Sequence, residues 1–72
     1  MATPVNAPMV GKVLNVVVHV GDHVEEDDAV VVIEAMKMEH AVATPIAGRV
    51  SRVLVREGQQ VQRGDLLAEV SA

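Results

Sequence analysis

The chain has 72 residues and a formal net charge of −4, with six Lys and Arg residues against ten Asp and Glu residues. This length allows one domain, and the absence of cysteine excludes disulfides and thiolate metal sites. With few basic residues and no Phe, Tyr or Trp, the chain lacks the usual features of nucleic-acid binding. No apolar run is long enough to cross a bilayer, so we expect a cytoplasmic protein without membrane insertion.

The first residues, 1–6, read as a short flexible lead ahead of a domain over residues 7–72. The sequence leaves open whether the chain is a complete small protein or an excised domain.

The domain contains an internal duplication, because residues 11–33 match residues 48–70 at a constant offset of 37. Pairs at this offset include two glycines, Gly11 and Gly48, and two aspartates, Asp28 and Asp65. A solenoid needs at least three repeats to bury a continuous core. Two copies therefore predict two similar halves that face each other across a pseudo-two-fold axis.

Each half reads as β structure. Val-rich runs over residues 16–20 and 52–56 predict strands bounded by glycine turns. Alternation predicts that Ala29 and Leu66 face inward together with a core of Val16, Val18, Val31, Ile33, Val53, Val55, Ala68 and Val70.

Val13 and Val50 break this alternation, which predicts a bulge after each of them. No stretch shows a sustained helical period. We expect an all-β fold, a flattened antiparallel barrel or sandwich of about eight short strands in two quasi-symmetric four-stranded halves.

Acidic and histidine residues give no metal site. Residues 25–28 are all acidic but lack the alternating oxygen spacing and glycine of a calcium loop. Asp27 occupies the place of Gly64 in the other half, where a turn with positive φ would favour glycine. His19 and His23 are separated by a turn and have no third ligand, and His40 is assigned no chemistry. We predict no catalytic residues either, since no nucleophile and base pair stands out.

One lysine stands out at the join between the halves, in the segment Glu34-Ala35-Met36-Lys37-Met38-Glu39. Lys37 follows an apolar run and would occupy a hairpin tip, projecting away from both chain ends. Methionine is a poor turn residue, and two exposed methionines are a liability without a partner surface to cover them.

The segment Ala35-Met36-Lys37-Met38 resembles the attachment motif of biotinyl carrier domains, and the resemblance extends from about residue 7 to residue 70. It implies biotin joined to Lys37 by an amide bond. It also implies a flattened β-barrel fold and a carrier of activated carboxyl groups, rather than an enzyme. Implied partners are a biotin protein ligase, a biotin carboxylase, and a carboxyltransferase or decarboxylase subunit.

The same resemblance implies roles for the neighbouring residues. Ala35, Met36 and Met38 would be read as the flanks of the attachment lysine, and Glu34 and Glu39 would contact the ligase.

Two alternatives use the same fold. A lipoyl carrier domain would present its lysine at the same turn, but it usually places aspartate before the lysine, where this chain has Met36. A structural module of this fold would carry no cofactor.

Overall fold

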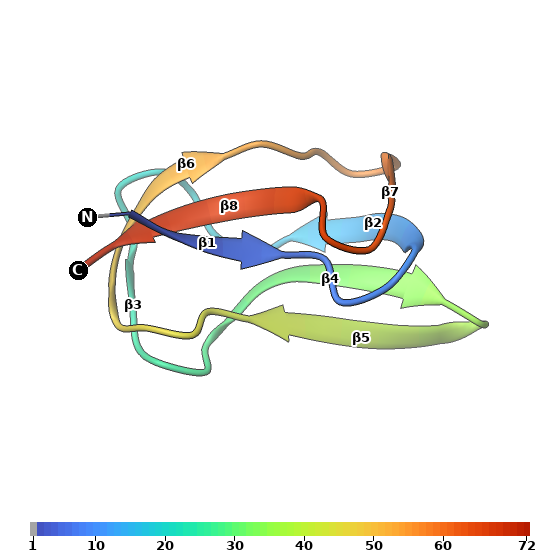
Figure 1. Cartoon of the computed structure of the whole chain (residues 1–72), viewed down its shortest axis with the longest axis horizontal. Helices are drawn as coiled ribbons and strands as arrows, with labels where there is room; N and C mark the ends of the chain where they lie inside the picture. Colours follow the sequence, from blue (N-terminus) through green and yellow to red (C-terminus); the bar gives the residue numbers. More distant parts are fainter. Residues whose placement is uncertain (1) are drawn as a thin grey trace.

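A computed structural model describes residues 2–72, which contain eight β-strands and no helix (Figure 1). The strands are β1 (Ala2–Asn6), β2 (Gly11–Val16), β3 (His23–Val24), β4 (Ala29–Ala35), β5 (Met38–Ala43), β6 (Gly48–Val53), β7 (Gln60–Val61) and β8 (Leu66–Ser71). All strand pairs in these residues are antiparallel, so the expected all-β fold is confirmed. No helix in the same range could span a membrane.

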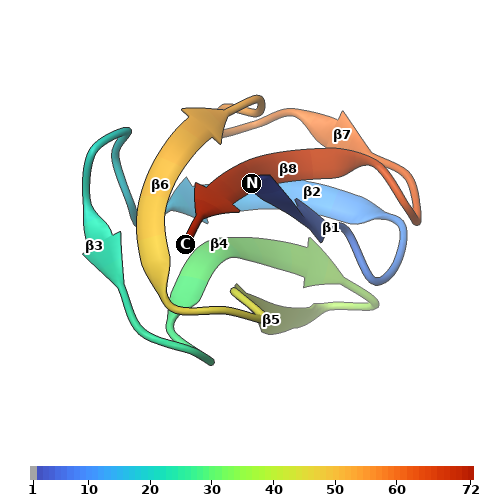
Figure 2. The same ribbon diagram turned by 60° about the vertical axis from the view of Figure 1, so that its left-hand side comes forward.

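The strands form two four-stranded sheets, with the orders β1-β8-β6-β3 and β5-β4-β2-β7. The offset of 37 residues carries β1 to β5, β2 to β6, β3 to β7 and β4 to β8, which converts the first order into the second. The predicted pseudo-symmetry is therefore present. Each sheet takes two strands from each half of the sequence, so the halves interleave and wrap around one core (Figure 2).

Bulges at equivalent positions decide which side chains enter the core. The register shifts after Val13 in the β2–β4 pair and after Val50 in the β6–β8 pair, as predicted, and both valines are buried. The register also shifts in the β4–β5 pair and in the β1–β8 pair, and these two bulges place Val30 and Leu67 in the core. The buried cluster is Val5, Ala7, Val13, Val18, Val24, Val30, Val31, Ile33, Val42, Val50, Val55, Val61, Leu67, Ala68 and Val70.

These second bulges correct part of the predicted core. Ala29 is exposed and Leu66 half-buried, because the bulge beside each one turns its neighbour inward instead. Val16 and Val53 are only partly buried and pack against the margin of the core. The other predicted core residues are buried: Val18, Val31, Ile33, Val55, Ala68 and Val70.

The strands expected over residues 16–20 and 52–56 are displaced toward the amino terminus. β2 ends at Val16 and β6 ends at Val53. One more backbone hydrogen bond forms just beyond the end of each strand. In the first half Val17 N–H donates to the Val30 carbonyl (3.0 Å), and the equivalent bond forms in the second half. Each of these bonds is to a bulged residue, after which the ladder stops.

The expectation of a flexible lead over residues 1–6 is wrong for the residues that the structure describes. Ala2–Asn6 form β1, which pairs with β8 along its length, and Val5 is 2% exposed. Pro4 obscures this strand in the sequence. Proline has no N–H for a ladder but is tolerated at a sheet edge, and β1 is an edge strand.

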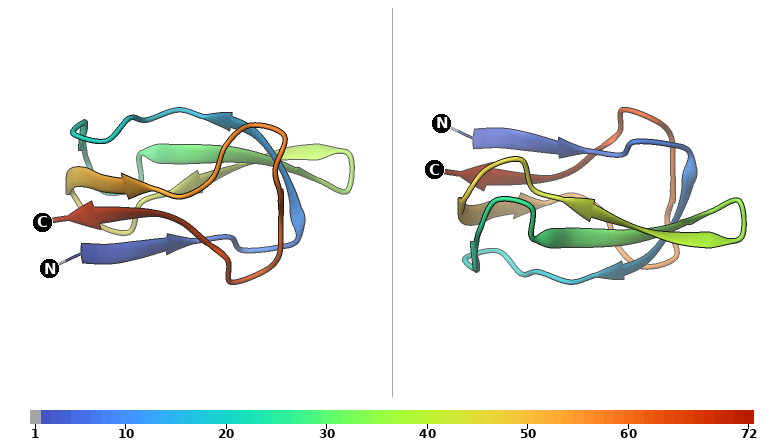
Figure 3. Two further views of the ribbon diagram at one scale, coloured as in Figure 1. Left: turned by 90° about the horizontal axis from the view of Figure 1, so that it is seen from above. Right: turned by 90° about the horizontal axis from the view of Figure 1, so that it is seen from below.

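The molecule is elongated, with extents of 33 × 17 × 17 Å. The β4–β5 hairpin projects from one end, and the start of β1 and the end of β8 lie together at the other (Figures 1 and 3). Ala2 pairs with Ser71 there. The hairpin thus extends away from the rest of the chain, as expected.

Candidate functional site

The projecting hairpin ends in a two-residue turn. Ala35 pairs with Met38, so Met36 and Lys37 are the central residues. Their φ angles are +53° and +61°, both in the left-handed region. Positive φ at both central positions defines a type I′ turn, whose twist matches that of the flanking strands. Lys37 therefore lies at the tip of a tight hairpin, where the sequence placed it.

This turn uses residues that its geometry disfavours. Type I′ turns favour Asn-Gly or Gly-Gly, because a Cβ in the left-handed region costs about 1–2 kcal/mol. Met36 and Lys37 both carry a Cβ and neither side chain is suited to this conformation. Such strain concentrates at functional positions, where a side chain is retained despite its cost in stability.

The motif around Lys37 has one buried residue and several exposed ones. Ala35 is buried at 8% exposure, while Met36 is 85% exposed and Met38 is 63% exposed. Lys37 is also exposed, and within residues 2–72 its ammonium group forms no ion pair. The turn thus presents a free amine between two apolar thioether side chains.

Two acidic residues flank the turn on neighbouring strands. Glu34 and Glu39 are directly opposite each other and both are exposed. Like charges opposite each other in a ladder are mildly destabilising. The pair therefore adds a second feature at this end that folding does not favour.

Gly11 supports the hairpin from the neighbouring strand, a role that sequence reasoning missed. A Cβ at this position would lie 2.6 Å from the backbone oxygen of Glu34. The close approach lets β2 lie beside the residues of β4 that lead into the turn. The match of Gly11 to Gly48 in the repeat was the available signal, since a Cβ at Gly48 would lie 2.1 Å from the Ser71 oxygen.

A shallow groove runs beside the turn, lined by Val10, Gly11, Lys12, Glu34, Ala35, Met36, Lys37 and Gln60. Its polar members follow from the ladder registers. Lys12 is opposite Glu34 on one side and Gln60 on the other, so their exposed side chains form a row across the outer face of the sheet. Val10, 52% exposed, adds an apolar side chain to the lining, as does Met36.

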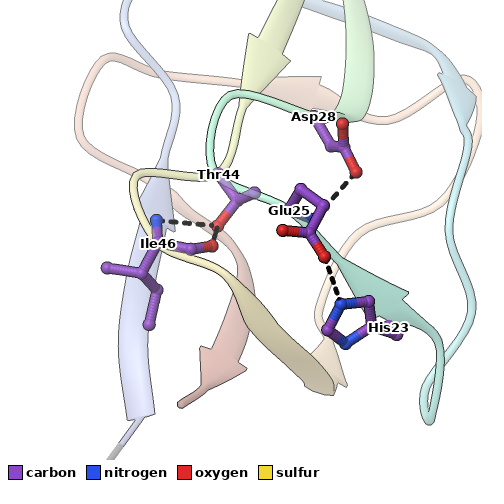
Figure 4. A network of polar contacts seen from close by, with 5 residues as sticks. All are labelled: His23, Glu25, Asp28, Thr44 and Ile46. Atoms are coloured by element: carbon purple, nitrogen blue, oxygen red, sulfur yellow. Dashed lines mark hydrogen bonds and ion pairs between the residues drawn. The ribbon is translucent and has the colours of Figure 1, made fainter.

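The remaining polar candidates serve local structure. At the opposite end of the molecule, the Asp28 carboxylate accepts a hydrogen bond from Glu25 N–H (2.8 Å), and the His23 ring contacts the Glu25 carboxylate (Figure 4). The buried Thr44 hydroxyl donates to the Ile46 carbonyl (2.7 Å). Within residues 2–72, no three His, Asp or Glu side chains gather as metal ligands.

Two further histidines also lie outside any such cluster. His19 N–H donates to the Asp22 carboxylate (2.8 Å). His40, on β5 opposite Ile33, has a buried Nε2 that finds no hydrogen-bond partner among residues 2–72.

Comparison with protein families identifies the domain. The model of the family described as "Biotin-requiring enzyme" matches residues 3–70. The chain belongs to this family. The match includes residues 3–6 of β1, which agrees with the structural role of that strand, and it covers the hairpin with Lys37.

Relatives of this Biotin-requiring enzyme family member include the methylmalonyl-CoA decarboxylase subunit gamma of Propionigenium modestum. The two are 58% identical over 36 residues, which cover 50% of this chain and 27% of that subunit. The biotinylated protein TB7.3 homolog of Mycolicibacterium smegmatis is 54% identical over 39 residues, 54% of this chain and 55% of the relative. The matches thus span about half or less of these curated relatives.

Among solved structures, the urea carboxylase of Kluyveromyces lactis contains a closely similar domain. The TM-score is 0.94 at 38% identity, over 99% of this chain and 6% of the carboxylase. The fold therefore occurs there as a small part of a much longer chain.

Proposed function

We propose that this domain is a biotin carboxyl carrier, with biotin joined by an amide bond to Nζ of Lys37. The observation that carries the proposal is the strained type I′ turn, which holds a lysine where an Asn-Gly pair would be more stable. Membership of the Biotin-requiring enzyme family supports the carrier role and the covalent cofactor. Relatives named for biotin, such as the TB7.3 homolog, support it as well.

The residues at the turn fit this cofactor. Amide formation needs a primary amine that can enter a ligase active site, and Lys37 is exposed in the turn of the projecting β4–β5 hairpin. The ligase supplies biotin as an activated acyl group and a base for the ammonium proton. The new N–C bond then forms as the activating group departs.

The side chains around Lys37 have recognition roles in this proposal. Met36 and Met38 offer flexible apolar contacts that a ligase surface would cover, and Ala35 fixes the strand from which the turn projects. Glu34 and Glu39 would meet polar groups at the rim of that surface.

Bound biotin supplies a ureido nitrogen that takes up and releases a carboxyl group. The domain itself contributes position rather than catalysis, and we propose no catalytic residue in it. The rigid β-sandwich holds the base of the lysine stem, so the tethered group samples a small volume at a concentration on the order of millimolar. A stem of this length can enter one active site after another without dissociation of the cofactor.

The proposed partners are a biotin protein ligase, a biotin carboxylase, and a carboxyltransferase or decarboxylase subunit. Support for the carboxylase-type partners comes from the relatives, which include a decarboxylase subunit and a carboxylase. A cytoplasmic location, where such a ligase would modify the chain, stays a prediction.

Intact mass spectrometry after co-expression with biotin protein ligase tests the proposal. We expect one biotin increment on the wild type and on Lys12→Arg, and none on Lys37→Arg. Arginine keeps the positive charge but has no primary amine for acylation. Lys12 is the matched control because it is the only other lysine. Biotin on Lys37→Arg would overturn the assignment.

The same experiment distinguishes the two alternatives. A lipoyl increment after co-expression with a lipoate ligase, without biotin incorporation, would identify a lipoyl carrier. No increment with either ligase would identify a structural module without a cofactor.

A further inference from the structure

We infer that the groove beside the turn is a resting site for the biotinyl group carried by Lys37 of the same chain. This inference rests on the proposed function and extends it to residues outside the attachment motif. Lys37 itself lines the groove together with Val10, Lys12 and Gln60. The cofactor would therefore be tethered at the edge of its own binding surface.

The polar row in the groove matches the ureido group of biotin. A ureido group has one carbonyl oxygen that accepts hydrogen bonds and two N–H groups that donate them. The Lys12 ammonium donates, the Glu34 carboxylate accepts, and the Gln60 amide does both. Because Lys12 lies opposite both of the others in the β-ladder, these groups adjoin one another on one exposed face.

These groups are free to take a ligand. Within residues 2–72, Lys12 forms no ion pair although Glu34 is its cross-strand neighbour. The Gln60 side chain likewise makes no hydrogen bond to another described residue. Donor and acceptor capacity on this face is therefore left to solvent or to a ligand.

The apolar part of the cofactor has a matching surface. Val10 and Met36 are exposed at 52% and 85%, and both line the groove. The hydrocarbon chain and thioether ring of biotin would cover them, and the Met36 thioether is a soft, adaptable contact. Docked biotin would therefore shield exposed apolar surface near the turn from water.

Tethering makes a weak site sufficient. The effective concentration of a group on a short flexible link is on the order of millimolar, so an intrinsic dissociation constant of the same order gives about half occupancy. An open groove with exposed, solvated groups is suited to weak binding of this kind. The cofactor would then leave for a partner active site without a large penalty.

NMR spectroscopy of the apo and biotinylated wild-type domain tests the inference. Amide formation shifts the resonances of residues 36–38 in any case, so they are not informative. We expect additional shifts at the Val10 methyl groups and at the Lys12 and Gln60 amides. We also expect nuclear Overhauser contacts from the biotin ring protons to the Val10 methyl groups.

Two substitutions of exposed valines provide a matched pair. Val10→Ser removes the apolar wall, whereas Val20→Ser changes a valine of similar exposure (63%) in a turn near the opposite end. If docking becomes roughly tenfold weaker, the occupied fraction falls from about a half to about a tenth. The shift change at Gln60 should fall in proportion for Val10→Ser and persist for Val20→Ser.

Mass spectra of the same samples separate the two levels of the proposal. A biotin increment without shifts at Lys12 and Gln60, or equal shifts in both serine variants, would overturn the resting site and leave the carrier function standing. Failure to incorporate biotin at all would overturn the carrier function and the resting site together.

Discussion

The two ends of this molecule are equivalent in the repeat but differ in how the chain completes them. The offset of 37 residues carries the Ala2–Ser71 pair of one end onto the Glu39–Glu34 pair of the other. At the first end, the start of β1 pairs with the end of β8, and no turn joins the two strands. At the second, a two-residue turn joins the strands and holds Lys37.

This difference separates the requirements of the fold from those of function. Hydrogen bonds in the two halves match at the same offset: Asp27 N–H donates to the Thr44 carbonyl (2.9 Å), and Gly64 N–H donates to the Ala7 carbonyl (2.8 Å). Met36 and Lys37 have no counterpart among the 72 residues. These two unmatched residues form the left-handed turn and carry a methionine side chain that is 85% exposed and the Lys37 amine.

The two close-packed glycines provide the largest test of this comparison. We expect Gly11→Ala to cost about 1–3 kcal/mol in unfolding free energy, because the new Cβ meets the Glu34 backbone inside a closed hairpin. It should also displace the turn and slow biotinylation. Gly48→Ala should cost at least as much, because its Cβ would lie 2.1 Å from the Ser71 oxygen at a φ of +158°, but this clash is at the end of the molecule away from the turn.

Urea denaturation and biotinylation at limiting ligase measure both variants. Gly48→Ala should modify at the wild-type rate, with amide shifts confined to the terminal end. Slower biotinylation of Gly48→Ala than of Gly11→Ala would contradict the separation of the two ends.

Replacing the turn itself tests the strain. The double substitution Met36→Asn with Lys37→Gly supplies residues suited to a type I′ turn and should stabilise the domain by about 1–2 kcal/mol. For a domain of this size, each kcal/mol raises Tm by about 4–8 °C. Calorimetry of the apo proteins measures the change, with Lys37→Arg as a control that keeps the strain. An unchanged or lowered Tm would show that the turn is not strained.

Recognition of the turn by the ligase should depend on Met36. Met36→Asp replaces an exposed apolar contact with a charge that the ligase must desolvate, so we expect biotinylation to slow by about tenfold, or about 1.4 kcal/mol. Susceptibility to a lipoate ligase should rise, and thermal stability should change little, because aspartate tolerates positive φ. Equal biotinylation rates at limiting ligase would mean that the ligase reads the fold alone.

The smallest expected effect concerns the equivalent turns that contain Asp27 and Gly64. Both residues have positive φ, +73° and +88°. Asp27→Gly relieves the cost of a Cβ there, offset by the flexibility of glycine in the unfolded chain, for a net gain of about 0.5–1 kcal/mol. Gly64→Asp should lose a similar amount in urea denaturation. A gain from both substitutions would break the equivalence of the two turns.

Much of the fold could be predicted, because the sequence repeat reflects the two similar halves and the spacing of the valines reflects which side chains face the core. The bulges after Val13 and Val50 follow from broken alternation alone. The bulges that bury Val30 and Leu67 could not be found in this way, because each lies in a run of apolar residues where both alternations fit equally well. Pro4 concealed β1, since proline in a short segment usually signals a loop.

The candidate site was predictable in position but not in conformation. The motif around Lys37 and the join between the halves both pointed to a hairpin tip. Nothing in Met36-Lys37 predicts a left-handed backbone, because neither residue favours it and the flanking strands impose it. The groove depends on cross-strand neighbours of Lys12, which pattern reasoning along a single strand does not reveal.

Pairing of Ala2 with Ser71 brings the start of β1 and the end of β8 to one place on the surface. A polypeptide that enters and leaves such a unit does so through one small area, at the far end of its long axis from the lysine. A covalent connection at one or both of these strand ends would therefore leave the end that holds Lys37 uncovered. A unit with the same fold forms 6% of the urea carboxylase of Kluyveromyces lactis.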